Sequence, residues 1–312
     1  MASPLLRIGT RGSPLALAQA AEVATRLAKA QPALAAPGAI ETVAIRTSGD
    51  ATTQSLAALG GKGLFAKEIE EALLARRIDL AVHSLKDLPT FLPAGLALGA
   101  HLPREDPRDA WFSPRAPGLG ALPPGARIGT SSPRREAQLR HARPDVAIVP
   151  LRGNVETRLR KLEAGEVDAT VLAVAGVKRL GLAGRITAIL SAEEMLPAAA
   201  QGAIGVEIRA DDAAARALAA AIDDAPTAAR VTAERAVLAA LGGSCRTPIA
   251  ALAEIGADGA LRLRAMILRP DGSERLLAER SGPAAAAVAL GQDAGGELRR
   301  RAAPDFFAED RA

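Results

Sequence analysis

The sequence predicts an α/β protein made of two similar units with mixed, mainly parallel sheets, followed by a small C-terminal α+β domain. A first internal echo relates Arg7-Ile-Gly-Thr-Arg-Gly-Ser-Pro to Arg127-Ile-Gly-Thr-Ser-Ser-Pro, each a short apolar strand that leads through small residues into helical sequence. A second echo relates residues 71–82 to residues 162–171, each typical of a helix end, a turn with Asp and a buried strand. Strands that alternate with helical stretches in this way favour βαβ units.

Both copies of the first echo place Ser before Pro, and we expect helices over 14–30 and 133–142 after them. Ser13 and Ser132 are suited to cap these helices, and proline suits the first helical position. A strand that leads into a helix N-terminus creates an anion site, because free N–H groups and the helix dipole both favour negative charge. The sequence therefore predicts an anionic ligand at these junctions.

The remaining elements follow from apolar periodicity and from turn residues. The Pro- and Gly-rich stretch 116–125 is expected to be a loop within the second unit. Gly242 and Gly243 are expected to end a helix over 226–241, and Asp271-Gly272 to mark a hairpin turn. The other expected elements are strands over 203–208, 249–256, 260–268 and 274–280, and helices over 211–222 and 283–302.

The composition narrows the functional classes. The 312 residues include one Cys, three His, five Phe, one Trp and no Tyr, and the net charge is +4. One thiol excludes an internal disulfide, and a structural metal centre is not expected. Scarce aromatic residues and a modest charge count against nucleic-acid binding. No secretory signal and no apolar run of membrane length is found, so we expect a cytoplasmic protein without membrane association.

Basic residues are concentrated in the segment 126–161, which carries nine basic side chains against three acidic ones. Arg134, Arg135 and Arg152 stand at strand-to-helix junctions, where a planar guanidinium suits carboxylates or phosphates. A ligand with several such groups is therefore predicted. Four of the other basic residues are expected to form a solvated helix face with scattered salt bridges. These are Arg140, Arg143, Arg160 and Lys161.

Asp87 follows a buried strand at the edge of the sheet where ligands bind in open α/β folds. It is either an acid–base or cation-stabilising group, with Ser84 and Lys86 beside it, or a cap for the turn before Pro89. His83 is expected to be a packed, hydrogen-bonded residue rather than a catalyst. Spacing alone leaves both interpretations of Asp87 open.

Two further segments carry candidate chemistry. Gly60-Gly-Lys-Gly-Leu-Phe is either a mobile loop over a site or only a turn, and it departs from the nucleotide-binding pattern because Gly follows Lys62. Cys245 follows Gly-Gly-Ser on a predicted loop. A lone cysteine is usually a small buried hydrophobe, whereas a neighbouring cation such as Arg246 lowers the pKa of a thiol and makes it reactive.

These segments together resemble the porphobilinogen deaminase (hydroxymethylbilane synthase) family over nearly the whole chain, from about Leu6 to the last strands. The resemblance rests on seven motifs in a fixed order. They are Thr10-Arg-Gly-Ser-Pro-Leu-Ala-Leu-Ala-Gln, Gly60-Gly-Lys-Gly-Leu-Phe, Ala81-Val-His-Ser-Leu-Lys-Asp-Leu-Pro, Gly129-Thr-Ser-Ser-Pro-Arg-Arg, Leu151-Arg-Gly-Asn-Val, Leu172-Ala-Val-Ala-Gly-Val-Lys-Arg-Leu-Gly and Gly243-Ser-Cys-Arg-Thr-Pro-Ile.

The resemblance implies two lobes like those of periplasmic binding proteins, joined by two crossing strands, and a third small domain with the cysteine. We expect lobe 1 over 1–102 and 203–221, lobe 2 over 103–202, and the C-terminal domain over 222–312. The family joins four porphobilinogen molecules head to tail with loss of ammonia and releases hydroxymethylbilane. The growing polypyrrole is built on a dipyrromethane cofactor, which the resemblance attaches to Cys245 by a thioether. A monomer is expected.

The resemblance also assigns site residues. Asp87 matches the catalytic aspartate, and residues 47–63 match a lid. The positions that match cofactor- and substrate-binding residues are Arg11, Ser13, Gln19, Asp50, Lys62, Phe65, Ser84, Lys86, Thr130, Ser131, Ser132, Arg134, Arg135, Arg152, Gly153, Asn154, Arg158, Ala173, Arg179 and Gln201. No metal ligand is assigned.

The sequence departs from the family pattern at three places, and other functions remain open. Ala58 stands where some members have a lysine, Ser244 where a glycine is frequent, and Pro133 where aliphatic residues are common. The first departure puts one cationic contact of the lid in doubt. A two-lobed binding protein for an organic polyanion is the alternative function, and a nucleic-acid binder that uses the segment 126–161 is a third.

Overall fold

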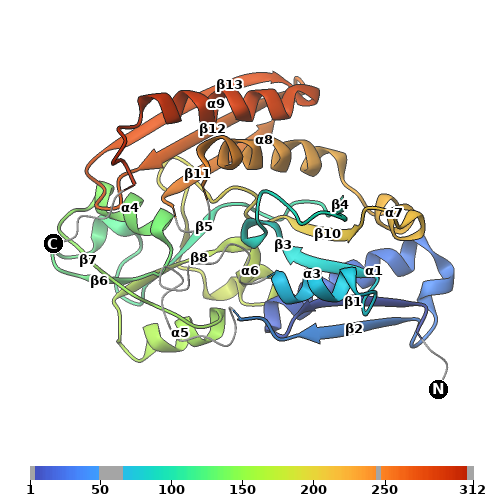
Figure 1. Ribbon diagram of the computed structural model, residues 1–312. Helices are drawn as coiled ribbons and strands as arrows, with labels where there is room; N and C mark the ends of the chain where they lie inside the picture. The colour runs from blue at the N-terminus through green and yellow to red at the C-terminus, as the bar shows by residue number, and fades with distance from the viewer. Residues whose placement is uncertain (1–3, 49–65, 244–246, 308–312) are drawn as a thin grey trace. The chain divides into compact units, whose positions relative to one another are not determined.

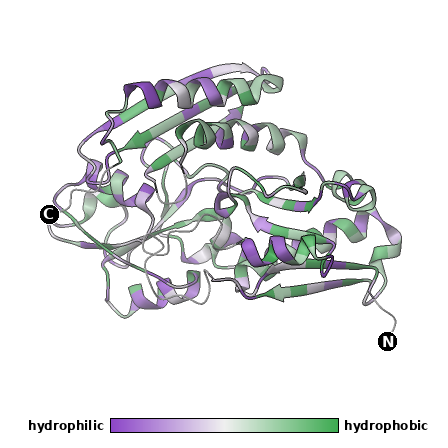
Figure 2. Ribbon diagram, in the orientation of Figure 1, coloured by the Kyte–Doolittle hydropathy of each residue, from purple (hydrophilic) through white to green (hydrophobic). Residues whose placement is uncertain are grey.

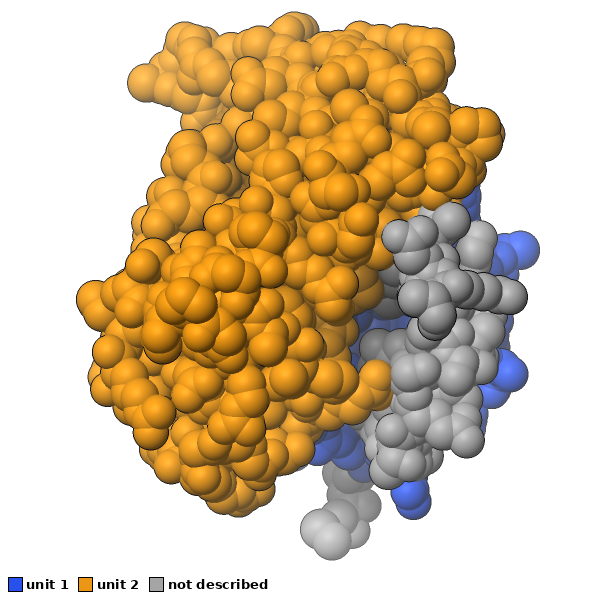
Figure 3. Space-filling view, turned by 90° about the vertical axis from the view of Figure 1, so that its left-hand side faces the viewer, with its two compact units in different colours: residues 1–105, 203–228 blue, residues 106–202, 229–312 orange. Residues whose placement is uncertain are grey.

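The computed structural model describes residues 4–48, 66–243 and 247–307 (Figure 1). The chain forms two compact units, which consist of residues 1–105 with 203–228 and of residues 106–202 with 229–312 (Figure 3). The chain therefore passes from one unit to the other three times. The division into three domains expected above stays a prediction.

A five-stranded mixed sheet forms the centre of unit 1, in the order β2-β1-β3-β10-β4. Its strands are β2 (Ile40–Ile45), β1 (Leu6–Arg11), β3 (Leu80–Ser84), β10 (Ile204–Arg209) and β4 (Leu96–His101). Strand β1 is parallel to β2 and β3, and β10 is antiparallel to β3 and β4. Four of the five strands thus run the same way, which confirms a mixed, mainly parallel sheet.

Helices cover both faces of this sheet. They are α1 (Pro14–Ala30), α3 (Lys67–Leu74) and α7 (Ala213–Ala220). Because successive strand residues point to opposite faces, Val82 and Val206 pack in one cluster with Val23 of α1 and Ala219 of α7. Ala81 packs in a separate cluster with residues of α3. The next residue of β3 on that second face is His83, and β10 contributes Glu207 to it.

Unit 2 repeats the arrangement, with its sheet in the order β7-β6-β8-β5-β9. The strands are β7 (Ala147–Val149), β6 (Arg127–Gly129), β8 (Ala169–Ala173), β5 (Asp109–Phe112) and β9 (Ala188–Ile189). Strand β6 is parallel to β7 and β8, and β5 is antiparallel to β8 and β9. Each strand has its counterpart in unit 1 at the same place and in the same direction, so the internal echoes reflect one shared topology.

The helices of this second α/β part are α4 (Pro133–Ala142), α5 (Val155–Glu163) and α6 (Val174–Arg179). Leu139 of α4 packs with Trp111 and Ile128 on one face of the sheet. Leu159 of α5 packs with Phe112 on the other face. In Figure 2, α5 carries many of the hydrophilic residues, as expected of a helix with one solvated side.

The C-terminal part of unit 2 is a three-stranded antiparallel sheet with two helices. Its elements are α8 (Ala225–Leu241, in unit 2 from residue 229), β11 (Ile249–Ile255), β12 (Ala260–Leu268), β13 (Arg275–Pro283) and α9 (Ala287–Arg301). Val237, Leu263 and Leu298 share one cluster. Gly291 lets α9 approach α8, because a Cβ there would lie 2.2 Å from the carbonyl oxygen of Ala233.

The element boundaries follow the sequence signals closely, with one clear error. The predicted helices 14–30 and 133–142 coincide with α1 and α4. Gly242 adopts a φ of 63° and the N–H of Gly243 donates to Leu238 O, so the glycines end α8 as expected. The predicted strand 274–280 is too short, because β13 stays paired with β12 up to Pro283. A 3-10 turn (Ala284–Ala286) therefore precedes α9, where a helix from 283 was expected.

Candidate functional site

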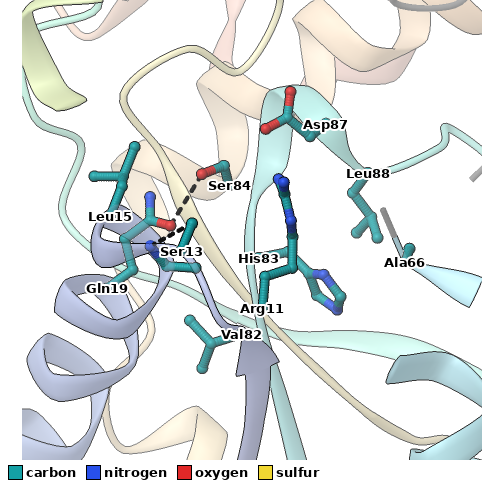
Figure 4. A pocket seen from close by; sticks show the side chains of 11 residues that line it. Arg11, Ser13, Leu15, Gln19, Ala66, Val82, His83, Ser84, Asp87 and Leu88 are labelled. Carbon is teal, nitrogen blue, oxygen red and sulfur yellow. Dashed lines mark hydrogen bonds between the residues drawn. The ribbon is translucent and has the colours of Figure 1, made fainter. Parts of the chain in front are cut away.

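Unit 1 contains a hollow at the carboxyl ends of β1 and β3, beside the start of α1 (Figure 4). Parallel strands end at the same edge of a sheet, which is where open α/β folds bind ligands. The hollow is lined by Arg11, Ser13, Leu15, Ala16, Gln19, Ala66, Val82, His83, Ser84, Asp87 and Leu88. Five of the residues assigned by the resemblance are thus brought together in one place.

Gln19 and Ser84 are hydrogen-bonded to each other within the hollow. The Ser84 hydroxyl donates to Gln19 Oε1 at 2.9 Å, and Gln19 is buried on the inner side of α1 (Figure 4). Ser13 caps α1, since the N–H of Ala16 donates to Ser13 Oγ at 3.3 Å. The Ser13 hydroxyl proton stays able to donate to a ligand, because only the oxygen is used by the cap.

Asp87 ends a short 3-10 turn (Leu85–Asp87) that directly continues β3. Its carboxylate lines the hollow and is half-buried. Within the described ranges it accepts no hydrogen bond from the backbone, so the capping role left open by the sequence is not seen. Lys86 lies in the same turn and is half-buried as well. A carboxylate held at a strand end without a local partner is placed to meet a ligand.

His83 is packed, as expected. Its Nε2 lies 3.0 Å from Glu207 Oε2, and both side chains are buried. Glu207 was not found by sequence reasoning, because its position in the apolar strand β10 gives no local sign of a histidine partner 124 residues away.

Arg134 and Arg135 occupy the first turn of α4 in unit 2, and both are buried. Each donates through Nη2 to Asp109 at 2.7 Å, Arg134 to Oδ2 and Arg135 to Oδ1. Arg134 also donates through Nη1 to the carbonyl oxygen of Leu196 at 2.8 Å. Asp109, the first residue of β5, is fully buried. The two arginines therefore already hold a carboxylate of the chain itself, which sequence reasoning missed.

The electrostatics of this cluster remain unbalanced. Burial would raise the pKa of Asp109, but attraction to Arg134 and Arg135 and their hydrogen bonds hold that pKa far below its usual value. Burial lowers the pKa of Arg134. Two guanidinium groups face one carboxylate, and the Nε atoms of both arginines are buried without a hydrogen-bond partner among the described residues. The cluster thus keeps one net positive charge in the interior of unit 2.

Gln201 belongs to the same network. Its Nε2 donates to Asp109 Oδ1 at 2.8 Å and to the carbonyl oxygen of Pro107 at 2.8 Å. Gln201 is buried, and it stands just before the chain passes back into unit 1. Gly202, the next residue in the chain, accepts a hydrogen bond through its carbonyl oxygen from Nη2 of Arg179, at 3.1 Å. Arg179 is the last residue of α6.

The residues before α4 make local hydrogen bonds. Thr130 Oγ1 accepts from the N–H of Ser132 at 3.2 Å, and Ser131 Oγ donates to Leu151 O at 3.3 Å. Ser132 occupies the N-cap position, but its side chain makes no capping bond, so this expectation was wrong. Thr130 takes the N–H of Ser132 instead.

The segment before α5 is shaped by its own sequence. Gly153 has a φ of 113°, which favours glycine, and Asn154 caps α5 by accepting from the N–H of Thr157 at 2.8 Å. Arg158 Nε donates to Gly153 O at 2.8 Å. These contacts account for Gly153 and Asn154 without a ligand. Arg152 is half-buried in the same loop.

Other assigned residues have simpler placements. Ala173 ends β8 and precedes α6. Arg140 pairs with Glu136 and Arg143 with Asp145, as expected of a solvated face. Four assigned residues, Asp50, Lys62, Phe65 and Cys245, lie outside the described residues.

In the described part of the chain, no group of three His, Cys, Asp or Glu side chains could hold a metal ion, and no helix is both long and apolar enough to span a membrane.

Comparison with family models gives two matches. Residues 6–217 match "Porphobilinogen deaminase, dipyromethane cofactor binding domain", and residues 228–300 match "Porphobilinogen deaminase, C-terminal domain". A porphobilinogen deaminase of Paracoccus denitrificans (strain Pd 1222) is 57% identical over 303 residues, which cover 97% of this chain and 96% of that protein. The chloroplastic porphobilinogen deaminase of Oryza sativa subsp. japonica is 49% identical over 306 residues, 97% of this chain and 86% of that protein.

Solved structures of low sequence identity are also similar. A periplasmic substrate-binding protein of an ABC transporter from Coxiella burnetii is 17% identical, with a TM-score of 0.44 over 70% of this chain and 91% of that chain. A nutrient-binding protein from Burkholderia cenocepacia bound to methionine is 15% identical, with a TM-score of 0.43 over 70% of this chain and 91% of that chain.

Proposed function

The chain belongs to the porphobilinogen deaminase family, and from this membership we propose how its residues perform the family reaction. The protein is a transferase of tetrapyrrole biosynthesis that acts on porphobilinogen and uses a dipyrromethane cofactor. We propose that it joins four porphobilinogen molecules head to tail, with release of ammonia at each step and of hydroxymethylbilane at the end. The alternative of a polyanion-binding protein without catalysis loses support, since the relatives of high identity are named as the deaminase.

The observation that supports this proposal most is the buried cluster of Arg134, Arg135 and Asp109. A buried pair of cations that faces only one carboxylate keeps a net positive charge, which suits a ligand rich in carboxylates. Dipyrromethane is such a ligand, because each of its rings carries an acetate and a propionate. We assign its carboxylates to Arg134 and Arg135, with Thr130, Ser131, Ser132, Arg152, Arg158, Arg179 and Gln201 as further donors. When bound, the cofactor supplies the free α-carbon of a pyrrole as the nucleophile.

Asp87 is the residue to which we assign the chemistry at the substrate. The C–N bond of the protonated aminomethyl group breaks, its electron pair leaves with ammonia, and positive charge remains on the pyrrole and its methylene carbon. A carboxylate at Asp87 stabilises that charge in a site with little water. The same group can hold the proton that moves at the leaving amine or at the pyrrole nitrogen.

The remaining residues of the unit 1 hollow suit the substrate side chains. Arg11 offers a cation to the acetate or propionate of porphobilinogen, and Ser13 offers a hydroxyl. Lys86, which lies in the turn that ends at Asp87, is proposed as a second cation. Gln19 fixes the orientation of Ser84 through the bond described above. Asp50, Lys62 and Phe65 are proposed as further contacts on the strength of the resemblance alone. A monomer in the cytoplasm stays a prediction.

The test of the proposal is intact-protein mass spectrometry of the purified active enzyme. We propose a thioether between the cofactor and Cys245, so the wild-type mass should exceed the sequence mass by one dipyrromethane. The variant Cys245→Ser should show the sequence mass and no activity. Arg246→Lys is the matched control, because it changes the neighbouring residue and keeps the thiol. An active wild-type enzyme with the unmodified mass would contradict the attachment.

A further inference from the structure

A pair of buried carboxylates lies on the face of the unit 1 sheet that α3 covers, next to the hollow. Glu70 belongs to α3 and is 7% exposed, and Glu207 belongs to β10 and is 0% exposed. Neither residue was assigned a role by the sequence. Charged groups avoid the interior unless they are paired, so two buried carboxylates on one face of a sheet call for an explanation.

His83 provides only part of that explanation. Its Nε2 lies 3.0 Å from Glu207 Oε2, which satisfies one oxygen of one carboxylate. The Oε1 atoms of both Glu70 and Glu207 are buried with no hydrogen-bond partner among the described residues. One histidine thus faces two carboxylates, and the set keeps an unbalanced negative charge whenever both are ionised.

The other charged groups around α3 do not remove this imbalance. Arg209, on the same strand as Glu207, donates to the carbonyl oxygens of Leu73 and Ile78 and pairs with Asp212. On α3 itself, Lys67 pairs with Glu71, and Glu68 accepts from Ser48. Arg11, at the end of β1, lines the hollow. Among the ion pairs of the described residues, the contact between His83 and Glu207 is the only one that involves either carboxylate.

The charge of the pair changes near neutral pH. The pKa of Glu70 is raised to about 7, first by burial and then by the negative charge of Glu207, while His83 opposes the increase. Glu70 is therefore mostly protonated around pH 6 and mostly ionised around pH 8, so the pair gains one negative charge between these pH values.

We propose that Glu70 and Glu207 are positioning residues of the deamination reaction, whose combined negative charge acts through His83 on the hollow that holds Asp87. The proposal rests on the function proposed above. His83 directly precedes Ser84 on β3 and lines the same hollow as Asp87, so its partner Glu207 is separated from the site by one side chain. The form with both carboxylates ionised is the more active one.

The chemistry of the step gives the reason. Before ammonia leaves, the positive charge sits on an ammonium group that donates three hydrogen bonds. After the C–N bond breaks, the charge is spread over the pyrrole and its methylene carbon, which offer few hydrogen bonds. A delocalised cation of this kind depends on the electrostatic field of its surroundings, and fixed negative charge in a medium of low dielectric constant provides that field.

The test compares the wild-type holoenzyme with Glu70→Gln between pH 6 and pH 8.5. Gln imitates the protonated acid, so the two enzymes should have equal kcat/KM near pH 6. At pH 8 the variant should have a kcat/KM about fivefold lower, because it lacks one buried negative charge. The readout is the ratio of the two profiles, which cancels every ionisation that both enzymes share.

Glu71→Gln is the matched control, since it removes an exposed carboxylate from the adjacent position of the same helix. Its kcat/KM should follow the wild-type profile closely, because the charge of Glu71 is the smallest of the causes that raise the pKa of Glu70. A Glu70→Gln profile that is parallel to that of the wild type, or a Glu71→Gln profile that departs equally, would overturn the proposal. Glu207→Gln provides a second variant, and it too should lose activity more at pH 8 than at pH 6.

Failure of this inference can be told from failure of the proposed function. Cofactor content is measured by intact mass in every variant before the kinetics, and thermal unfolding checks that each variant is folded. If the wild-type enzyme itself releases no ammonia from porphobilinogen, the proposed function is wrong. If the wild type is active and Glu70→Gln follows the same pH profile, only the role of the carboxylate pair is wrong.

Discussion

Asp109 and Arg134 are joined by a contact of 2.7 Å between two side chains that are both buried, and the aspartate holds Arg135 at the same distance. One carboxylate at the start of β5 thus orients two guanidinium groups at the start of α4. Their Nε atoms are buried without a hydrogen-bond partner among the described residues, and the cluster keeps one net positive charge. An acidic residue of the chain therefore fixes the two arginines to which we assign the cofactor carboxylates.

We expect Asp109→Asn to destabilise the fold by about 3 kcal/mol, because it leaves two buried cations without their carboxylate. Urea unfolding of the variant measures the loss as a lower midpoint. Cofactor content should fall in the same variant, since the arginines lose their fixed orientation. Asp145→Asn is the control, because that exposed residue also pairs with an arginine of the same unit. Equal midpoints for the two variants would contradict the role of Asp109.

We expect Asp87→Asn to keep the fold and substrate affinity but to lower kcat by about a hundredfold or more, as loss of one preorganised charge at a reacting centre does. Single-turnover release of ammonia measures the effect. Asp87→Glu keeps the charge and should retain more activity than the amide. A rate for Asp87→Asn close to that of the wild type would exclude Asp87 from the chemistry.

Local signals predict most of the secondary structure. Ser13 before Pro14 and Gly242 after Leu241 are enough to set the ends of α1 and α8, because caps depend on neighbouring residues only. The strand order could not be predicted in the same way. Strands β3 and β10 pair across the whole of the intervening unit 2 sequence, and no local pattern specifies a partner so distant.

In the candidate site, too, features set by local sequence could be predicted, whereas contacts between distant residues could not. The positions of Asp87 and of the arginine pair at strand ends could be predicted, since they stand in motifs there, whereas their roles stay predictions. Asp109 could not, because it begins an apolar strand and its partner Arg134 is 25 residues away. Gly153 and Asn154 also stand in a family motif. Asn154 caps α5 and Gly153 adopts a positive φ just before it, so this motif contains residues that form the start of a helix.

We expect Gly205→Ala to destabilise the fold by about 1–3 kcal/mol, as overpacking does. A Cβ at this position would lie 2.3 Å from Leu85 Cδ2, and Leu85 begins the turn that ends at Asp87. Activity should therefore fall more than stability alone explains. Gly118→Ala is the control, because no atom lies within 4 Å of its added Cβ. Chemical denaturation and kcat, measured on both variants, decide the outcome.

The raised pKa of Glu70 also predicts how stability depends on pH. The folded protein binds the Glu70 proton more tightly than the unfolded chain, so this proton stabilises the fold fully below pH 4.5, and the contribution is lost as the pH rises through about 7. In Glu70→Gln the melting temperature should fall less between pH 5 and pH 8 than in the wild type. Calorimetry across this range checks the prediction, and an equal decrease in both proteins would contradict it.

The strand order has a consequence for the newly made chain. Strand β10, which lies between β3 and β4 in the unit 1 sheet, is encoded after residue 202, whereas the five strands of the unit 2 sheet lie within residues 109–189. During translation, residues 1–105 therefore leave the ribosome with two unsatisfied strand edges. We expect the unit 2 sheet to form before the unit 1 sheet is complete. We also expect residues 1–105 to aggregate when they are expressed alone.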